Sequence, residues 1–300
     1  MISRREFLGR ASAYTAVTAL AGRCAVSHAE PLGLPLGLQL YSVRQQLATE
    51  YEGTLQQVSS IGYREVEAAG FYKRSAGEVK QAMQKANLRC VSAHYPFAEL
   101  KAHFDEILTF ANEVGIEYLI CASPGFKTPD AAAGKGRVLS LEDWRWNADQ
   151  FNEMGKKAKG AGLKFGYHNH IREFAVTEGM VPYMELLRLT DPAWVTLELD
   201  CGWAVVAGSS PESLLRDHPG RFSMLHVKDS KRGAVAKVGP LEHEPVVTEL
   251  GLGSIDYRPI FAQAAKTQKI KHLFVEQEAF DMPYMQSLKV DADYMRGLKT

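Results

Sequence analysis

Short apolar runs alternate with longer segments of helical periodicity along most of this chain. The runs cover residues 36–42, 63–68, 88–94, 117–123, 163–170, 194–200, 222–229 and 271–278. Such alternation is typical of a parallel sheet with helical crossovers. An open doubly wound sheet usually has a glycine-rich phosphate loop after its first strand, and none follows the first run here. The pattern therefore predicts an α/β protein with a single (β/α)8 barrel, the TIM barrel.

Within these runs, apolar residues alternate with polar or ionisable ones. Residues two apart in a strand share a face, so the apolar set faces the helices and the polar set faces the barrel interior. The outward set is Leu38, Leu40, Val66, Val91, Leu197, Leu199, Leu225, Val227, Leu273 and Val275. The inward set is Gln39, Tyr41, Glu65, Glu67, Ser92, His94, His168, His170, Glu198, Asp200, His226, Lys228, Glu276 and Glu278.

An interior packed only for stability would be mostly aliphatic, because unpaired buried charges cost several kcal/mol each. Four of the runs end on residues that can bind a metal, in the segments FGYHNH, VTLELD, SMLHVKD and HLFVEQE. In a barrel these ends meet at the mouth formed by the carboxyl ends of the strands. The pattern therefore predicts a divalent cation in a hydrated pocket at that mouth.

The first 29 residues have the features of an export signal. Arg4 and Arg5 precede an Ala/Thr-rich, acid-poor segment that ends at Ser27-His28-Ala29, a small-x-small cleavage pattern. We expect a twin-arginine signal over residues 1–29, export to the periplasm, and one barrel domain over residues 30–300. A stable membrane anchor is not expected, because polar residues interrupt the apolar run well short of the about 20 residues that a spanning helix needs.

Charge and composition narrow the class of partner. The chain has 35 basic and 35 acidic residues, a pI near 7.1 and 46% hydrophobic residues. This balance argues against binding of nucleic acid or an anionic membrane and favours a small-molecule partner. Cys90, Cys121 and Cys201 each lie in or beside an apolar run, so we expect buried thiols.

Several segments in this order resemble those of the xylose isomerase-like TIM barrels, a sugar phosphate isomerase/epimerase family that includes inosose dehydratases, inosose isomerases and ketose 3-epimerases. The segments are LGLQLYSVR, GYREVE, SAH, LELDCGW, LHVKD, LGLGSIDY and FVEQE. The resemblance spans essentially the whole mature chain. It implies one Mn, Mg, Co or Zn ion held by Glu, Asp, His and Glu from strands five to eight.

Three of those four ligands match this chain by position, namely Asp200, His226 and Glu276. The fourth differs, because His168 stands where many relatives have Glu, and Glu173 is an alternative carboxylate in the following loop. An imidazole ligand favours Mn, Co or Zn over Mg. Trp203 and Leu252 also depart from the family, where His and Glu are frequent.

The resemblance implies roles for further residues. Glu276 would be both ligand and base, Glu67 is the candidate second acid/base, and His94, His170 and Lys228 would bind or protonate sugar oxygens. Gln39, Tyr41 and Trp203 are expected to line the sugar site. A metal-dependent isomerase or epimerase acting on a keto-sugar or ketoglycoside through an enediolate is the expected activity. An exported enzyme is expected to meet unphosphorylated sugars.

Alternatives remain open at this stage. The same enediolate serves a dehydratase or lyase, the endonuclease IV relatives of this barrel are metal hydrolases, and a sugar-binding protein without activity would keep the pocket. Among residues, Asp200 could only cap a helix, Lys228 and Asp229 could be a solvated pair, and Glu65 and Glu198 suit structural or supporting roles. The oligomeric state has no signature in the sequence, although relatives are often dimers or tetramers.

The export signal makes a direct prediction. Mass spectrometry of the protein recovered from the periplasm should show a mature chain that begins near Glu30, because the cleavage pattern ends at Ala29. Recovery of the intact chain from the cytoplasm alone would contradict the assignment.

Overall fold

The computed structural model describes residues 31–128, 137–231 and 247–298. The expected export signal and parts of the two long loops after the fourth and seventh predicted strands lie outside the described residues. The described strands form a closed barrel in the order β1-β10-β7-β6-β5-β4-β3-β2, and every pair in it is parallel. The predicted single (β/α)8 barrel is confirmed.

Each predicted apolar run overlaps one barrel strand. The strands are β1 (Gly37–Gln39), β2 (Glu65–Ala68), β3 (Arg89–Pro96), β4 (Tyr118–Ser123), β5 (Lys164–His168), β6 (Val195–Asp200), β7 (Phe222–Val227) and β10 (His272–Val275). A short antiparallel pair, β8 (Asp229–Ser230) and β9 (Val247–Thr248), follows β7 and was not predicted.

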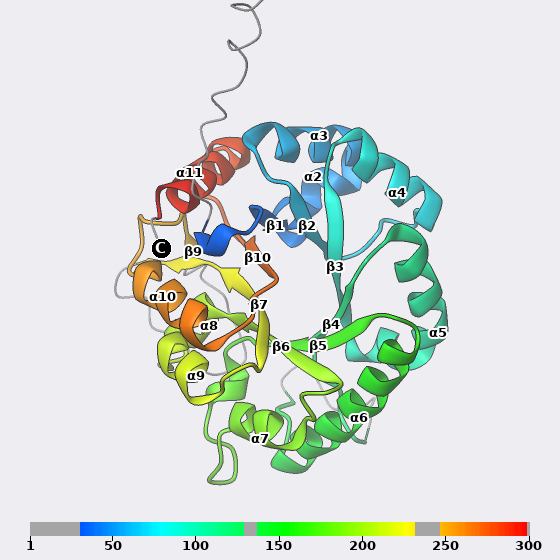
Figure 1. The fold of residues 1–300 in the computed structure, drawn as a ribbon, viewed down its shortest axis with the longest axis vertical. Coiled ribbons are helices and arrows are strands. Elements are labelled where there is room, and N and C mark those ends of the chain that lie inside the picture. The colour runs from blue at the N-terminus through cyan, green and yellow to red at the C-terminus, as the bar shows by residue number, and fades with distance from the viewer. Residues whose placement is uncertain (1–30, 129–136, 232–246, 299–300) are drawn as a thin grey trace, which may run out of the picture.

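Helices form a ring around the barrel (Figure 1). They are α2 (Arg44–Thr49), α3 (Tyr51–Ile61), α4 (Ala76–Lys85), α5 (Phe97–Val114), α6 (Leu141–Gly160), α7 (Pro182–Leu189), α8 (Cys201–Val206), α9 (Pro211–Asp217), α10 (Tyr257–Thr267) and α11 (Tyr284–Gly297). Short 3-10 turns occupy Pro31–Gly33, Leu40–Val43 and Arg172–Phe174. Within the described ranges, none of the helices has the length and apolarity needed to cross a bilayer.

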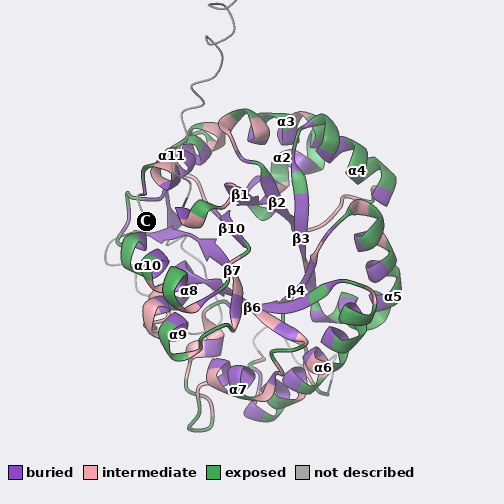
Figure 2. Cartoon of the chain, viewed as in Figure 1, coloured by how far each residue is buried: buried purple, intermediate pink, exposed green. Residues whose placement is uncertain are grey.

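The main core lies between the strands and the helices, and the strands are buried throughout most of their length (Figure 2). The outward residues of the strands, such as Leu38, Val66 and Leu199, belong to this core. A smaller apolar cluster of Val91, Tyr118, Ile120, Met224 and Phe274 is separate from it. Met224 pairs in register with Glu198, and Phe274 pairs with His226, so this cluster fills the barrel interior beside the polar residues.

The outward position predicted for Val91 is wrong. Val91 belongs to the interior cluster, although simple alternation along β3 assigns it to the helix side. The register between β2 and β3 shifts at this point, because Val66 pairs with Cys90 whereas the next residue, Glu67, pairs with Ser92. A β-bulge inserts one residue and breaks the two-residue period locally.

Several strands end earlier than the apolar runs predicted, and backbone N–H groups just beyond their ends bind side chains. His170 N–H donates to Glu173 Oε1 at 2.9 Å. Lys228 N–H donates to the Tyr257 hydroxyl at 2.8 Å, and Gln277 N–H donates to Ser42 Oγ at 2.9 Å. His170, Lys228, Glu276 and Glu278 therefore lie just beyond the strands, at the mouth.

Asp229 organises the loop that leads from β9 to α10. Its Oδ1 accepts hydrogen bonds from the N–H groups of Ser230, Ser254 and Ile255, and its Oδ2 accepts from Gly251 and Gly253, at 2.8–3.1 Å. A Cβ atom at Gly253 would lie 2.1 Å from Asp229 Oδ1, so the loop requires glycine there. Asp229 is buried, and the alternative of a solvated Lys228–Asp229 pair is wrong.

The same loop is attached to the last helix, α11. Leu250 N–H donates to Asp291 Oδ1 at 2.7 Å, and the Ser287 hydroxyl donates to Glu249 Oε1 at 2.8 Å. Asp291 Oδ2 is buried and has no hydrogen-bond partner among the described residues. Burial raises the pKa of Asp291 to about 7, and the nearby charges of Glu249 and Asp229 add to the rise.

This shift predicts a pH-dependent stability that Asp291→Asn should remove. The pKa of Asp291 is higher in the folded protein than in the unfolded chain, so the folded state favours the neutral carboxyl. The stability that this neutral group contributes is fully present below about pH 4 and is lost as the pH rises through 7. Asparagine keeps an oxygen for Leu250 N–H and carries no charge. Urea unfolding at pH 8 should therefore show the variant more stable than the wild type by up to about 4 kcal/mol, with the difference shrinking towards pH 5.

The exposed residue Asp149 on α6 gives the matched control. The Asp149→Asn variant should follow the wild type at both pH values. A constant difference between Asp291→Asn and the wild type from pH 5 to 8 would contradict the prediction.

Candidate metal centre

The four predicted ligands converge at the mouth of the barrel. His168 ends β5, Asp200 ends β6, His226 lies in β7, and Glu276 directly follows β10. One ligand atom from each residue can be chosen so that all four atoms lie within 4.8 Å of one another, and all four residues are buried. Parallel strands of a barrel bring their carboxyl ends together, so residues far apart in sequence meet here.

Two buried carboxylates determine which imidazole nitrogen faces the ligand cluster. His168 Nδ1 lies 3.0 Å from Glu198 Oε2, which leaves Nε2 facing Asp200 Oδ2 at 3.9 Å. His226 Nε2 lies 2.6 Å from Glu67 Oε1, which leaves Nδ1 facing Glu276 Oε2 at 3.2 Å. A carboxylate behind each ligand histidine is the usual way in which proteins orient imidazoles toward a metal.

Asp200 has two functions, one for each carboxylate oxygen. Its Oδ1 accepts the Trp203 N–H at 2.7 Å and caps the start of α8. Its Oδ2 is buried and accepts no hydrogen bond among the described residues, while the Lys228 ammonium lies 3.1 Å away. The cap foreseen as an alternative is therefore present together with an oxygen that is free to bind a cation.

Lys228 connects the ligands to the outer part of the mouth. Its Nζ lies 2.8 Å from Glu276 Oε2 and also bonds Glu278 Oε1. The Trp203 ring covers Nζ at 4.4 Å from the ring centroid, and its indole N–H donates to Glu278 Oε1 at 3.1 Å. The charges of Asp200, Glu276 and Glu278 outweigh burial and raise the pKa of Lys228. Lys228 is therefore a permanent cation in this site.

His94, Glu67 and Gln39 lie in a layer beneath the ligands. His94 Nε2 is 2.8 Å from Glu67 Oε1 and 2.7 Å from Glu198 Oε2. Gln39 Nε2 donates to Glu67 Oε1 at 2.7 Å, and the Ser92 hydroxyl donates to Glu67 Oε2. Gln39, Glu67 and Ser92 are register partners on β1, β2 and β3. Within this layer Gln39 and Glu67 are fully buried.

His168 and His94 differ in the direction of their pKa shifts. Burial, followed by the charge of His226, lowers the pKa of His168 well below its ordinary value. Burial alone would lower the pKa of His94 as well, but the charges of Glu67 and Glu198 outweigh it and raise that pKa to about 9. His168 is therefore a neutral imidazole with a lone pair available for a cation.

Other predicted residues lie at the rim of the mouth. His170 is exposed, and its ring centroid is 4.8 Å from that of His168. Tyr41 is also exposed, with the Arg44 guanidinium 4.1 Å above its ring. Glu173 does not join the ligand cluster, because its Oε1 accepts hydrogen bonds from the Tyr167 hydroxyl and His170 N–H.

Two other glutamates show what the sequence could and could not reveal. Glu65 bonds Arg89 and His272 at the opposite end of the barrel, in agreement with the structural function expected for it. Glu278 had no predicted function, although its spacing of two residues from Glu276 put it on the inward face. Its contacts with Lys228 and Trp203 depend on the approach of β6, β7 and β10, which the sequence of one segment does not show.

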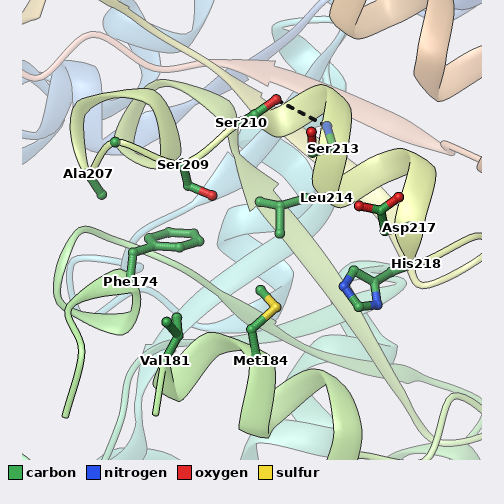
Figure 3. A pocket seen from close by; sticks show the side chains of 11 residues that line it. Phe174, Val181, Met184, Ala207, Ser209, Ser210, Ser213, Leu214, Asp217 and His218 are labelled. Carbon is green, nitrogen blue, oxygen red and sulfur yellow. Dashed lines mark hydrogen bonds between the residues drawn. The ribbon is translucent and has the colours of Figure 1, made fainter. Parts of the chain in front are cut away.

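A separate groove of about 360 Å³ lies on the outer helix layer (Figure 3). Phe174, Val181 and Met184 line one side, and Ser210, Leu214 and His218 line the other. None of its lining residues belongs to the ligand cluster. The groove is therefore separate from the ligand cluster at the mouth.

The sequence of this chain matches one known protein family. The family described as xylose isomerase-like TIM barrel matches residues 55–298. The chain belongs to this family, as its sequence motifs predicted. The family includes enzymes that act on sugars, in agreement with the expected class of small-molecule partner.

Individual relatives are more distant. The chain is 25% identical to an inosose dehydratase of Clostridium beijerinckii over 229 residues, which cover 70% of this chain and 76% of the relative. It is 25% identical to a sugar phosphate isomerase/epimerase structure from Parabacteroides distasonis, with a TM-score of 0.70 and coverage of 88% and 94%. A structure of IOLI protein with a binding zinc atom shares the fold at 12% identity, with a TM-score of 0.66 and coverage of 87% and 96%.

The residues of the cluster fit a divalent cation. Two oriented imidazole nitrogens and two carboxylates are the donor set that zinc and manganese accept. Asp200 Oδ2 gives a further indication, because it is buried and accepts no hydrogen bond among the described residues, with the Lys228 ammonium beside it at 3.1 Å. Residues His168, Asp200, His226 and Glu276 would hold the ion.

Replacing Asp200 or His226 with alanine should abolish ion retention. Both residues contribute a ligand, whereas the apolar layers that stabilise the barrel remain intact. Elemental analysis of reconstituted protein would measure the loss, and circular dichroism would check the fold. Ion content equal to the wild type in both variants would refute the ligand assignment.

Proposed function

We propose that this protein is a metal-dependent enzyme that removes the proton beside the ketone of a polyhydroxylated substrate and then eliminates water. The supporting observation is the convergence of His168, Asp200, His226 and Glu276 next to the Lys228 ammonium. A divalent cation bound there would polarise the ketone and offset negative charge on the substrate oxygens.

Glu276 is the base in this proposal. Its Oε2 is engaged by Lys228 and His226, whereas no hydrogen bond within the described chain reaches its Oε1. Lys228 and His226 thus fix the carboxylate and leave one oxygen for the proton of the substrate. Lys228 also places a positive charge beside the oxygens on which charge develops when the carbon–hydrogen bond breaks.

Elimination of water requires one base, which removes a proton from carbon, and one acid, which protonates the departing hydroxyl group. Glu276 takes the proton, the electron pair forms the new carbon–carbon double bond, and the hydroxyl group on the next carbon departs as water after receiving a proton. His170, exposed at the mouth beside His168, is the residue placed to supply that proton. The resemblance to an inosose dehydratase supports this outcome.

The position of Glu67 favours elimination over epimerisation through two carboxylates. Epimerisation by that route needs a second group that returns the proton on the opposite face of the carbon. Glu67 was the expected candidate, but both of its oxygens are engaged by Gln39, Ser92, His94 and His226 in the buried layer. We therefore assign Glu67 to the orientation of His226.

Isomerisation or epimerisation is the second candidate, and His170 is the observation that favours it. An exposed imidazole at the rim could return the proton to the face opposite Glu276. The similarity to a sugar phosphate isomerase/epimerase is consistent with this reaction. A metal hydrolase and a sugar-binding protein without activity remain as outcomes of the experiment below.

Incubation of metal-loaded protein with keto-sugars and keto-inositols in deuterated water tests the proposal. Mass spectrometry should show deuterium exchange beside the ketone together with a product lighter by one water. Exchange without water loss would transfer the assignment to the isomerase/epimerase reaction. Binding without exchange would refute both and favour a hydrolase or a binding protein.

Glu276→Gln should lower the exchange rate by about 10²- to 10⁴-fold, the usual contribution of a general base. Glu117→Gln gives the matched control, because Glu117 immediately precedes β4 and so lies at the amino-terminal end of the barrel. Its exchange rate should equal that of the wild type. Exchange at the wild-type rate in Glu276→Gln would eliminate Glu276 as the base.

A further inference from the structure

The carboxylates around Lys228 outnumber its single positive charge. Its Nζ lies 3.1 Å from Asp200 Oδ2 and 2.8 Å from Glu276 Oε2, and it also bonds Glu278 Oε1. Three negative charges therefore face one ammonium at the mouth of the barrel. A divalent ion held by the ligand cluster would offset this excess and would leave no surplus of positive charge.

The layer beneath the ligand cluster does not change this balance. Two carboxylates and two imidazoles face one another there at 2.6–3.3 Å, namely Glu67, Glu198, His94 and His226. Two imidazoles carry at most two positive charges, which the two carboxylates match. Neither layer of the site therefore provides an excess of positive charge that would attract an anionic substrate.

Glu278 is the most exposed of the charged residues around Lys228. Its side chain is 29% exposed, against 7% for Glu276 and 2% for Lys228. Its Oε1 accepts hydrogen bonds from Lys228 Nζ and from the Trp203 indole N–H, whereas no hydrogen bond from the described residues reaches its Oε2. Glu278 thus presents a fixed negative charge and one free acceptor to a molecule that enters the mouth.

We propose that Glu278 determines the charge class of the substrate: it accepts a hydrogen bond from a hydroxyl group of an uncharged polyhydroxylated molecule and repels a phosphorylated or carboxylated one. A hydroxyl group can donate to a carboxylate, whereas ionised phosphate and carboxylate groups offer only acceptors and negative charge. Without Glu278, the ion and Lys228 would outweigh the two remaining carboxylates, and the mouth would suit an anion. The inference rests on the proposed function for the polyhydroxylated substrate and adds the charge that this substrate carries.

Glu278→Gln tests the inference, because glutamine keeps an oxygen for Lys228 and Trp203 and removes only the charge. Calorimetric titration of the metal-loaded protein with inositol and with inositol monophosphate gives two dissociation constants, and neither probe has a ketone that could react. Wild type should favour inositol. Glu278→Gln should shift the ratio towards the phosphate by about ten- to thirty-fold, the effect of one unit charge about 8–12 Å away near a protein surface. Glu278→Ala should give the same shift with weaker binding of inositol, because it also removes the acceptor.

Glu99→Gln is the matched control. Glu99 is exposed in the first turn of α5, which directly follows β3 at the same end of the barrel, so the variant makes the same charge change outside the mouth. Its ratio of dissociation constants should equal that of the wild type. An equal shift in Glu99→Gln and Glu278→Gln would overturn the assignment to Glu278, because net charge alone would then explain it.

Three further results would overturn the inference. They are an unchanged ratio in both Glu278 variants, a wild type that prefers the phosphate, and a wild type that binds neither probe. Deuterium exchange beside the ketone of a keto-sugar is measured separately on the same protein. Exchange with an unchanged ratio would leave the proposed reaction intact and remove only the charge selection, whereas the expected shift without exchange would support the selection and refute the reaction.

Discussion

The contacts between buried carboxylates and imidazoles are the interactions on which the rest of this site depends. Glu198 and Glu67 are fully buried, and a buried carboxylate is costly unless its charge is matched. His168, His94 and His226 supply that match, and in doing so they are fixed in orientation. The remaining nitrogens of His168 and His226 face the ligand cluster. The polar interior of the barrel and the geometry of its mouth therefore have the same cause.

The layers on either side support this arrangement. On one side of it, the buried residues Met224 and Phe274 pair in register with Glu198 and His226 and fill the barrel interior beside them. Above it, Asp200 both caps α8 and faces the cluster, so the position of Trp203 is tied to that of the ligand. Trp203 in turn covers Lys228 and bonds Glu278. A shift of α8 would therefore change the charge environment of Glu276.

The sequence predicted the barrel and the convergence of the four candidate ligands because both depend on local, repeated signals. Alternation with a period of two assigns faces without knowledge of neighbouring strands, and strand ends of a parallel barrel always converge. Val91 was misplaced because a bulge depends on the partner strand, and Gln39 was expected to bind sugar although its partner Glu67 lies in another segment. The five hydrogen bonds of Asp229 bring together residues up to 26 positions apart, which no local pattern indicates.

The imidazole of His168 and the carboxylate of Glu198 are in direct contact inside the barrel. They are register partners on β5 and β6, and their polar atoms are 3.0 Å apart. A glutamate at position 168, as the resemblance would have it, would place two carboxylates side by side in a dry interior, where like charges repel strongly. The departure at His168 is therefore compatible with a metal site only because Glu198 supplies the negative charge from behind. The negative charge in this part of the site is carried by Glu198, which contacts His168 Nδ1 and so orients the imidazole.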